Sequence, residues 1–266
     1  SIAAPVVELN GLTTTLALSG RPAHLQVHAG RYTLASRALV VERGHFQSGG
    51  TSFDFHGNVE PIAQRSSSSA RLRFALTIPS VPLPTARGTG RRAVSGGRAA
   101  LDLRGTAGHG LESLEATGTL RVQDLVVDLS RTRAVTQTRQ QVGTAGAAAK
   151  ALDDLAAGGR FARITGQLRE QAEFYGPLLS EVDRPHTLAP FGGPLRISGR
   201  KITASPLTGA DLRGRLTYRL ASRHLDAHVG HLALGRVTLS DVSISGPGAS
   251  PAVSLDRKTI RLDGRP

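Results

Sequence analysis

The sequence predicts a mainly β protein, an antiparallel sheet with one α-helical insertion. Apolar and polar residues alternate with a period of two along most of the chain, which is typical of strands with one apolar and one polar face. Gly, Asn, Asp or Pro interrupts these runs about every 8–12 residues, the spacing of antiparallel meanders, sandwiches and barrels. One stretch, residues 132–157, lacks the alternation and has a helical composition. A parallel core in which strands alternate with helices is not expected.

The alternation is clearest in four runs, residues 12–18, 24–29, 71–78 and 212–220. The apolar residues of the last run are Leu212, Leu216, Tyr218 and Leu220, and its arginines on the opposite face are Arg213, Arg215 and Arg219. A register slip of one residue would bury these arginines, so the pattern fixes which face is apolar. We expect the even-numbered face to lie beside Leu225, Ala227 and Val229 of the next strand, and Gly214 to mark a bend.

The helical stretch at residues 132–157 is rich in Ala, Gln, Arg and Leu, contains no Pro, and has no β-branched residue after Thr144. A helical stripe runs along it, formed by Ala147, Ala148, Ala151, Leu152 and Leu155, and Gly158-Gly159 supplies a stop. Gly143 and Gly146 interrupt the stretch, which leaves one kinked helix and two short helices as alternatives.

The region after the helix is predicted to return to strands. Residues 161–166 and 193–199 are short alternating runs, each closed by Gly, whereas residues 174–194 predict a short helix followed by a loop. The loop at residues 82–97 is a candidate boundary between an N-terminal antiparallel β segment, residues 1–90, and a C-terminal β segment, residues 91–266. The alternative is that this loop lies within one sheet.

The charge balance is basic, with 33 Lys and Arg against 20 Asp and Glu among 266 residues, a net charge of +13. Basic charge favours anionic partners. The arginines are scattered, however, and their clearest local cluster is Arg87, Arg91 and Arg92. Aromatic residues are only 4% and Trp is absent, which is meagre for base stacking, so no nucleic-acid partner is expected. An Arg-heavy, Lys-poor composition is also what a GC-rich genome produces, and this explanation is preferred to a dedicated anion site.

No catalytic constellation stands out, and we predict that the protein is not an enzyme. The absence of Cys excludes thiol nucleophiles, cysteine–zinc sites and disulfides. The pairs His24/His28 and His224/His228 lie in strand-like runs, where four residues span about 13 Å, too far for one metal ion. The Gly88-Thr89-Gly90 segment lacks both the strand-to-helix context and the lysine of a phosphate-binding loop. We therefore expect no catalytic residue, no metal and no cofactor.

The second half of the chain carries a series of strand motifs in a characteristic order. They are Gly118–Leu129 followed by the helical insertion, Phe161–Gly166, Gly193–Gly199, Ala204–Leu220, Leu225–Val229, and Val242–Asp256 with its Gly246 and Pro251. This order resembles the C-terminal region of AsmA-like bacterial envelope proteins, a family that includes TamB-type members. The likeness covers about half of the chain, and residues 174–194 depart from it, since the family usually has a short turn there.

The resemblance implies a long, twisted antiparallel sheet curled into a trough or groove, as in the related bridge-like lipid transfer proteins. It implies a periplasmic, non-enzymatic module that transports phospholipid between the inner and outer membranes, with envelope proteins as partners. The chain starts without Met and ends within a strand-like run, so we expect a piece of a longer protein whose inner-membrane anchor lies outside this chain. No stretch here approaches the roughly 20 apolar residues of a membrane span.

The apolar strand faces then become candidate lipid-groove residues. These are Leu72, Phe74, Leu76, Ile78, Leu212, Leu216, Tyr218, Leu220, Leu225 and Val229. An apolar face must be buried by another layer or by a ligand, so a closed core remains the alternative to an open groove. The alternative function is a secreted or periplasmic β domain that binds a polyanion or acts as an adhesion or scaffold surface.

Overall fold

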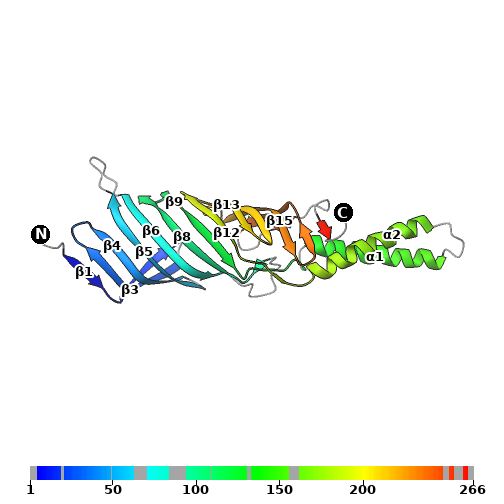
Figure 1. Ribbon diagram of the computed structural model, residues 1–266, viewed down its shortest axis with the longest axis horizontal. Helices are drawn as coiled ribbons and strands as arrows, with labels where there is room; N and C mark the ends of the chain where they lie inside the picture. The colour runs from blue at the N-terminus through cyan, green and yellow to red at the C-terminus, as the bar shows by residue number, and fades with distance from the viewer. Residues whose placement is uncertain are drawn as a thin grey trace.

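The computed structural model describes residues 5–18, 21–48, 50–62, 71–83, 94–108, 110–130, 133–155, 162–247, 252–254 and 260–262. The molecule is elongated, with a long antiparallel sheet from which a helical hairpin projects at one end (Figure 1). The prediction of a mainly β chain with an antiparallel sheet is confirmed. The arginine cluster and the Gly-Thr-Gly segment at residues 87–92, and the predicted stop at residues 158–159, lie outside the described residues.

Nineteen strands and two helices make up the described chain. The strands before the helices are β1 Val6–Leu9, β2 Leu12–Leu18, β3 Arg21–Thr33, β4 Ala38–Ser48, β5 Thr51–Ile62, β6 Arg71–Pro82, β7 Val94–Ser95, β8 Arg98–Gly108, β9 Gly110–Gln123 and β10 Val126–Val127. The helices are α1 Arg133–Leu155 and α2 Ala162–Val182. The later strands are β11 His186–Thr187, β12 Phe191–Ser198, β13 Lys201–Gly209, β14 Leu212–Arg219, β15 His224–Leu234, β16 Val237–Leu239, β17 Val242–Pro247, β18 Ala252–Ser254 and β19 Ile260–Leu262.

One 16-stranded sheet holds almost all of these strands, in the order β1-β3-β4-β5-β6-β8-β9-β12-β13-β14-β15-β16-β19. Off this path, β2 pairs with β3, β17 with β15, and β18 with β17, while β7, β10 and β11 form a separate small sheet. Neighbours along most of the path are also neighbours in sequence, as in a meander. Strands β6 and β8 pair directly with each other, and the division of the chain near residue 90 stays a prediction.

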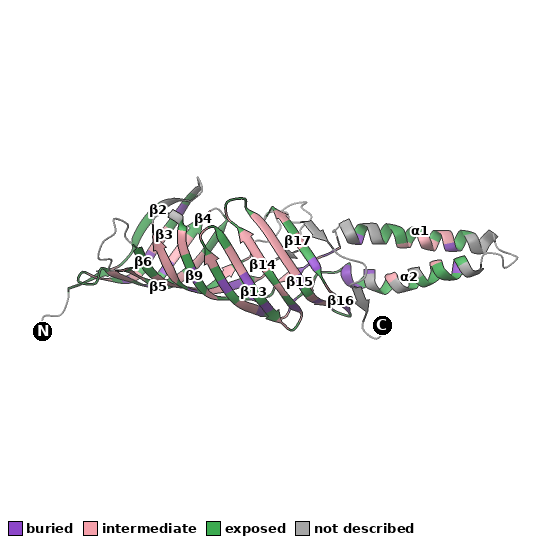
Figure 2. Ribbon diagram, turned by 90° about the horizontal axis from the view of Figure 1, so that it is seen from above, coloured by how far each residue is buried: buried purple, intermediate pink, exposed green. Residues whose placement is uncertain are grey.

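The helical insertion lies between β9 and β12 and extends away from the sheet (Figures 1 and 2). Helix α1 matches the stretch predicted at residues 132–157 and is one helix rather than two. The two helices pack on each other, and their contacts with the sheet are to β16 and β18 at its end.

The prediction of a strand at residues 161–166 was wrong, because helix α2 begins at Ala162. The prediction of a short helix followed by a loop at residues 174–194 is confirmed in part, since α2 ends at Val182 and irregular chain with the two-residue β11 leads to β12, but the helix is much longer than predicted. Gly166 and Pro177 both disfavour a helix, and the alternation around Ile164 imitates a strand. Thr165, Leu179 and Val182 of α2 are buried, and α2 packs on α1 and on β16. Leu179 and Val182 belong to the hydrophobic core that includes the end of the sheet. Tertiary packing has therefore overridden local propensity. The strand predicted at residues 193–199 is confirmed as part of β12.

The best-packed core lies where the sheet meets the helices. The largest fully buried side chains are those of Leu234, Val237, Leu239 and Val242. Glu181 lies nearby in the C-terminal turn of α2, and its carboxylate accepts a hydrogen bond from Arg184, just after the helix. That hydrogen bond holds the pKa of Glu181 below its usual value. Figure 2 shows that most of the remaining sheet is coloured as intermediate or exposed.

Candidate functional site

One face of the large sheet is apolar from end to end, because the strand registers align apolar residues in rows. Residues directly opposite each other in antiparallel strands carry their side chains on the same face. In the central row, each residue and the residue opposite it on the next strand are apolar or glycine. The row consists of Leu9, Gly30, Val41, Gly57, Leu76, Leu103, Gly118, Leu195, Ala204, Leu216, Ala227, Ile244 and Val253.

A second row runs parallel to the first on the same face. It consists of Val7, Tyr32, Leu39, Val59, Phe74, Gly105, Ala116, Ile197, Ile202, Tyr218, Leu225 and Gly246. The row between these two faces the other way and is mostly polar. It consists of Glu8, Arg31, Val40, Asn58, Ala75, Arg104, Thr117, Arg196, Thr203, Thr217, Asp226, Ser245 and Ala252. We call the first face the apolar face and the second the polar face.

The structure places the candidate groove residues of both segments on the apolar face. Leu76 and Leu216 belong to the central row, and Phe74, Tyr218 and Leu225 belong to the second row. The predicted pairing of β14 with β15 is confirmed, since Leu216 lies opposite Ala227 and Tyr218 opposite Leu225. The remaining candidates are Leu72 and Ile78 on β6, Leu212 on β14, Leu220 in the turn after β14, and Val229 opposite Gly214. Lipid contact by these residues stays a prediction.

The ten candidate groove residues differ in how exposed their side chains are. Ile78, Leu212 and Val229 are only 6%, 8% and 7% exposed, whereas Leu72 is 40% exposed. The other six are half-buried. Within the described ranges, the main contacts of the helices with the sheet are at its end, and no helix lies over the face between β3 and β14 (Figures 1 and 2). The apolar face is therefore shielded incompletely, by its own neighbouring side chains.

Glycines in the rows allow neighbouring strands to approach closely. A Cβ at Gly118 would lie 1.7 Å from the carbonyl oxygen of Asp102, and a Cβ at Gly57 would lie 2.3 Å from that of Ala75. At Gly214, where the sequence predicts a bend, the corresponding distance to the carbonyl oxygen of His228 is 2.6 Å. Only glycine fits such positions without movement of the backbone.

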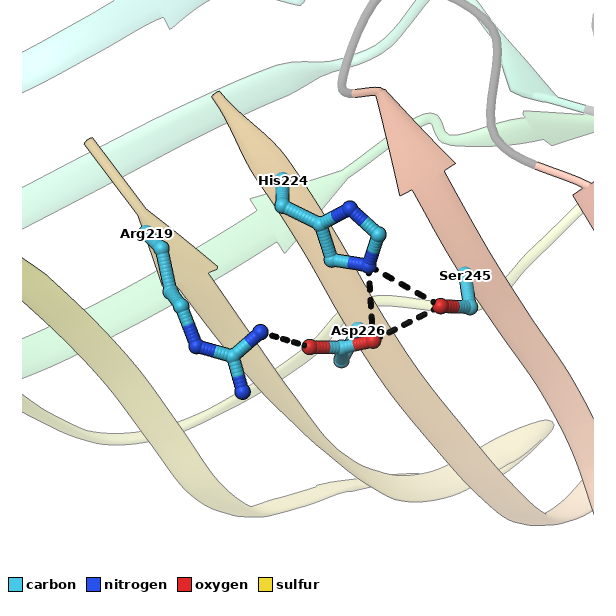
Figure 3. A network of polar contacts seen from close by, with 4 residues as sticks. All are labelled: Arg219, His224, Asp226 and Ser245. Carbon is cyan, nitrogen blue, oxygen red and sulfur yellow. Dashed lines mark hydrogen bonds and ion pairs between the residues drawn. The ribbon is translucent and has the colours of Figure 1, made fainter. Parts of the chain in front are cut away.

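A polar network on the polar face joins β14, β15 and β17 (Figure 3). Asp226 accepts hydrogen bonds from Arg219 Nη1 at 2.7 Å and from Ser245 Oγ at 2.7 Å. His224 Nε2 lies 3.1 Å from both Asp226 Oδ1 and Ser245 Oγ. The hydrogen bond from Ser245, followed by the charges of His224 and Arg219, holds the pKa of Asp226 below its usual value.

This Ser, His and Asp set does not have the geometry of a nucleophilic triad. In a triad the imidazole bridges the other two groups through its two different nitrogens, and the carboxylate does not bind the serine. Here the Ser245 hydroxyl donates directly to Asp226, and both meet the same nitrogen of His224. The network ties three strands together. Among the described residues, no group of His, Cys, Asp or Glu is arranged to hold a metal ion.

Sequence reasoning missed the N-terminal members of the two rows, including Tyr32, Leu39 and Val41, and it missed the Asp226 network. Both depend on register across strands, which a single sequence does not contain. One usable signal was present: residues 32–39 and 218–225 are near copies of each other.

Neither of the described helices is both long and apolar enough to cross a membrane. Comparison of the chain with protein-family models, with curated protein sequences and with solved structures finds no match. The resemblance to AsmA-like proteins therefore stays a prediction, carried by the motifs of the sequence.

Proposed function

We propose that this chain is a non-enzymatic module of cell-envelope biogenesis whose apolar face holds phospholipid acyl chains during transport between the inner and outer membranes. The uninterrupted apolar rows carry this proposal. From Leu9 to Val253 the central row contains no polar side chain, although it crosses most of the sheet. A protein that needed only a local core would have no use for an apolar stripe of this extent.

The energetics favour an occupant for this face. Apolar surface in water costs about 25 cal/mol per Å², and contiguous apolar patches beyond a few hundred Å² mark binding sites on soluble proteins. Phe74, Leu76, Leu216 and Tyr218 are half-buried, with no described helix above them. Each methylene group that a lipid buries against such side chains contributes about 0.8 kcal/mol.

The dimensions of the strands suit a lipid tail. Strand β14 has 8 residues, so it spans about 26 Å at the usual rise per residue. One leaflet of a bilayer contributes about half of the roughly 30 Å hydrocarbon thickness. An extended acyl chain therefore fits along a strand, and successive strands offer equivalent places side by side. In this proposal the sheet is curled into a trough, with the apolar face inside.

The resemblance to AsmA-like proteins adds the cellular setting to the proposal. We propose on this ground a module in the periplasm, held by an inner-membrane anchor outside this chain and working with other envelope proteins. Phospholipid is then the cargo, and the membrane is both donor and acceptor.

The polar face supports a second candidate function. Its central row contains Arg31, Arg104 and Arg196, and Arg213 and Arg215 of β14 are exposed on the same side. An extended surface of this kind suits a polyanion or an adhesion partner. Binding of soluble heparin that is lost on substitution of Arg213 and Arg215, in a protein that carries no lipid, would favour this alternative.

The lipid proposal is tested on protein purified without detergent, by native mass spectrometry and by extraction of bound lipid. We expect phospholipid to accompany the parent protein. Leu216→Gln reduces the bound lipid, because it places an amide in the central row, whereas Thr217→Gln on the opposite face is the matched control and leaves it unchanged. A parent protein that holds no phospholipid, and takes none up from phosphatidylglycerol vesicles, would refute the proposal.

A further inference from the structure

Three of the described hairpin turns along one edge of the large sheet contain arginine. Strands β3, β12 and β14 run in the same direction, so the turns that follow them, which carry Arg37, Arg200 and Arg223, fall on one edge. We call this edge the arginine edge. It bounds the apolar face next to the row that contains Tyr32 and Tyr218.

Two of these hairpins are copies of each other in sequence and geometry. The segments are Tyr-Thr-Leu-Ala-Ser-Arg-Ala-Leu at residues 32–39 and Tyr-Arg-Leu-Ala-Ser-Arg-His-Leu at residues 218–225, identical at six of eight positions. Tyr32 pairs with Leu39 and Tyr218 pairs with Leu225. Arg37 and Arg223 adopt φ values of 53° and 51°. Gly or Asn fits this left-handed position at lower cost, so the turn itself does not require arginine.

The guanidinium groups of these two turns are available to a ligand. Among the described residues, neither Arg37 nor Arg223 has an ion-pair or side-chain hydrogen-bond partner, and both side chains are exposed. The third arginine of the edge differs, because Arg200 forms an ion pair with Glu112. The two repeated turns thus present free cations beside tyrosines of the apolar face.

The opposite edge carries an exposed arginine as well. Arg236, in the turn between β15 and β16, has no ion-pair or side-chain hydrogen-bond partner among the described residues. Arg37 and Arg223 are therefore distinguished by the repeated turn that holds them and by the tyrosine in the row beside each turn. This arrangement matches an amphipathic ligand whose charged end lies at the turn and whose apolar part lies on the face.

We propose, resting on the proposed function, that Arg37 and Arg223 bind the phosphate groups of phospholipids whose acyl chains lie on the apolar face. Guanidinium groups pair well with phosphate oxygens through charge-assisted hydrogen bonds. Tyrosine suits the adjoining row, because its ring is apolar and its hydroxyl is polar. Strands β3 and β14 are eight places apart in the strand order, about 38 Å along the sheet at the usual strand spacing. The two turns therefore form separate headgroup positions.

The test compares two fluorescent lipids with the same acyl chains, phosphatidic acid and diacylglycerol, each carried in phosphatidylcholine vesicles. The protein is incubated with the vesicles and separated from them by flotation, and the probe bound per protein is measured. The test variant is Arg37→Gln with Arg223→Gln. The matched control is Arg213→Gln with Arg215→Gln, which removes two exposed charges from the polar face.

We expect the parent and the control to take up phosphatidic acid in preference to diacylglycerol. The test variant loses phosphatidic acid affinity about fivefold for each arginine, the usual effect of one basic residue on an anionic lipid, and keeps its uptake of diacylglycerol. Equal uptake of both lipids by all proteins would overturn the headgroup proposal and leave the proposed function standing. Uptake of neither lipid by the parent would refute both the headgroup proposal and the proposed function. An equal loss of phosphatidic acid binding in the control would also overturn the headgroup proposal, because it would indicate a general effect of charge. A protein that floats with the vesicles only while Arg37 and Arg223 are intact would overturn it too, because it would indicate binding to a bilayer surface.

Discussion

Replacing Gly118 by Ala introduces one methyl group at the centre of the apolar face. The Cβ would lie 1.7 Å from the carbonyl oxygen of Asp102 and 3.0 Å from Cα of Leu103, and both of these atoms belong to the backbone of β8. An ordinary contact needs more than 3 Å, so β8 and β9 must separate by over an ångström. Because Gly118 also pairs with Leu195, the separation disturbs ladders on both sides of β9.

The expected cost of Gly118→Ala is about 3 kcal/mol of unfolding free energy, from overpacking together with weakened ladder hydrogen bonds. Urea unfolding measures this change. The matched control is Gly143→Ala in α1, where no atom lies within 4 Å of the new Cβ. Ala is a better helix former than Gly, so this control stabilises by about 0.8 kcal/mol. A Gly118→Ala protein as stable as the parent would refute the argument that glycine is required for the close approach of these strands.

Four further substitutions test three features of the structure. Leu216→Gln on the half-buried face should lower the unfolding free energy by about 1 kcal/mol, whereas Leu239→Gln in the core, where Leu239 is 1% exposed, should lower it by about 4 kcal/mol. Equal losses of stability in thermal unfolding would contradict an incompletely covered apolar face. The folded pKa of Asp226 lies below its unfolded value, so the stabilisation from its network is present above the unfolded pKa of about 3.9 and is lost as the pH falls through the folded pKa. Asp226→Asn should therefore flatten the acid limb of a plot of Tm against pH, and an unchanged slope below pH 4 would count against the network. Pro177→Ala restores a helical N–H in α2 and should stabilise the folded protein by up to about 3 kcal/mol. Thermal unfolding of this variant beside the parent measures the change. A fall in Tm would mean that the proline is required there.

Much of the strand content was predictable from alternation, because one face of each strand is apolar and the other is polar. The position of α1 was predictable for a similar reason, since residues 133–155 lack strand-like alternation and Pro. The full length of helix α2 was not predictable from local sequence, because Gly166 and Pro177 oppose it and its packing against α1 and the end of the sheet stabilises it.

The candidate site was predictable in its residues but not in its arrangement. The pattern identified Leu76 and Leu216 as apolar strand positions, far apart in sequence. Their membership of one row depends on a chain of strand pairings through β8, β9, β12 and β13. The same holds for Asp226 and Ser245, which meet only because β15 pairs with β17. Register is a cooperative property of the whole sheet, so no local pattern contains it.

The sequential order of the strands has a consequence for the dynamics of the molecule. Most strands contact only the strands beside them, and the largest fully buried side chains gather on β15, β16 and β17 at the helical end. Stability then resembles a sum of nearest-neighbour interfaces, as in repeat proteins, and opening is local. Amide hydrogen exchange should be slowest on β15 and β16 and grow faster toward β2. A ligand lying across several strands would join these interfaces, so the steepness of the exchange gradient would report directly how fully the apolar face is occupied.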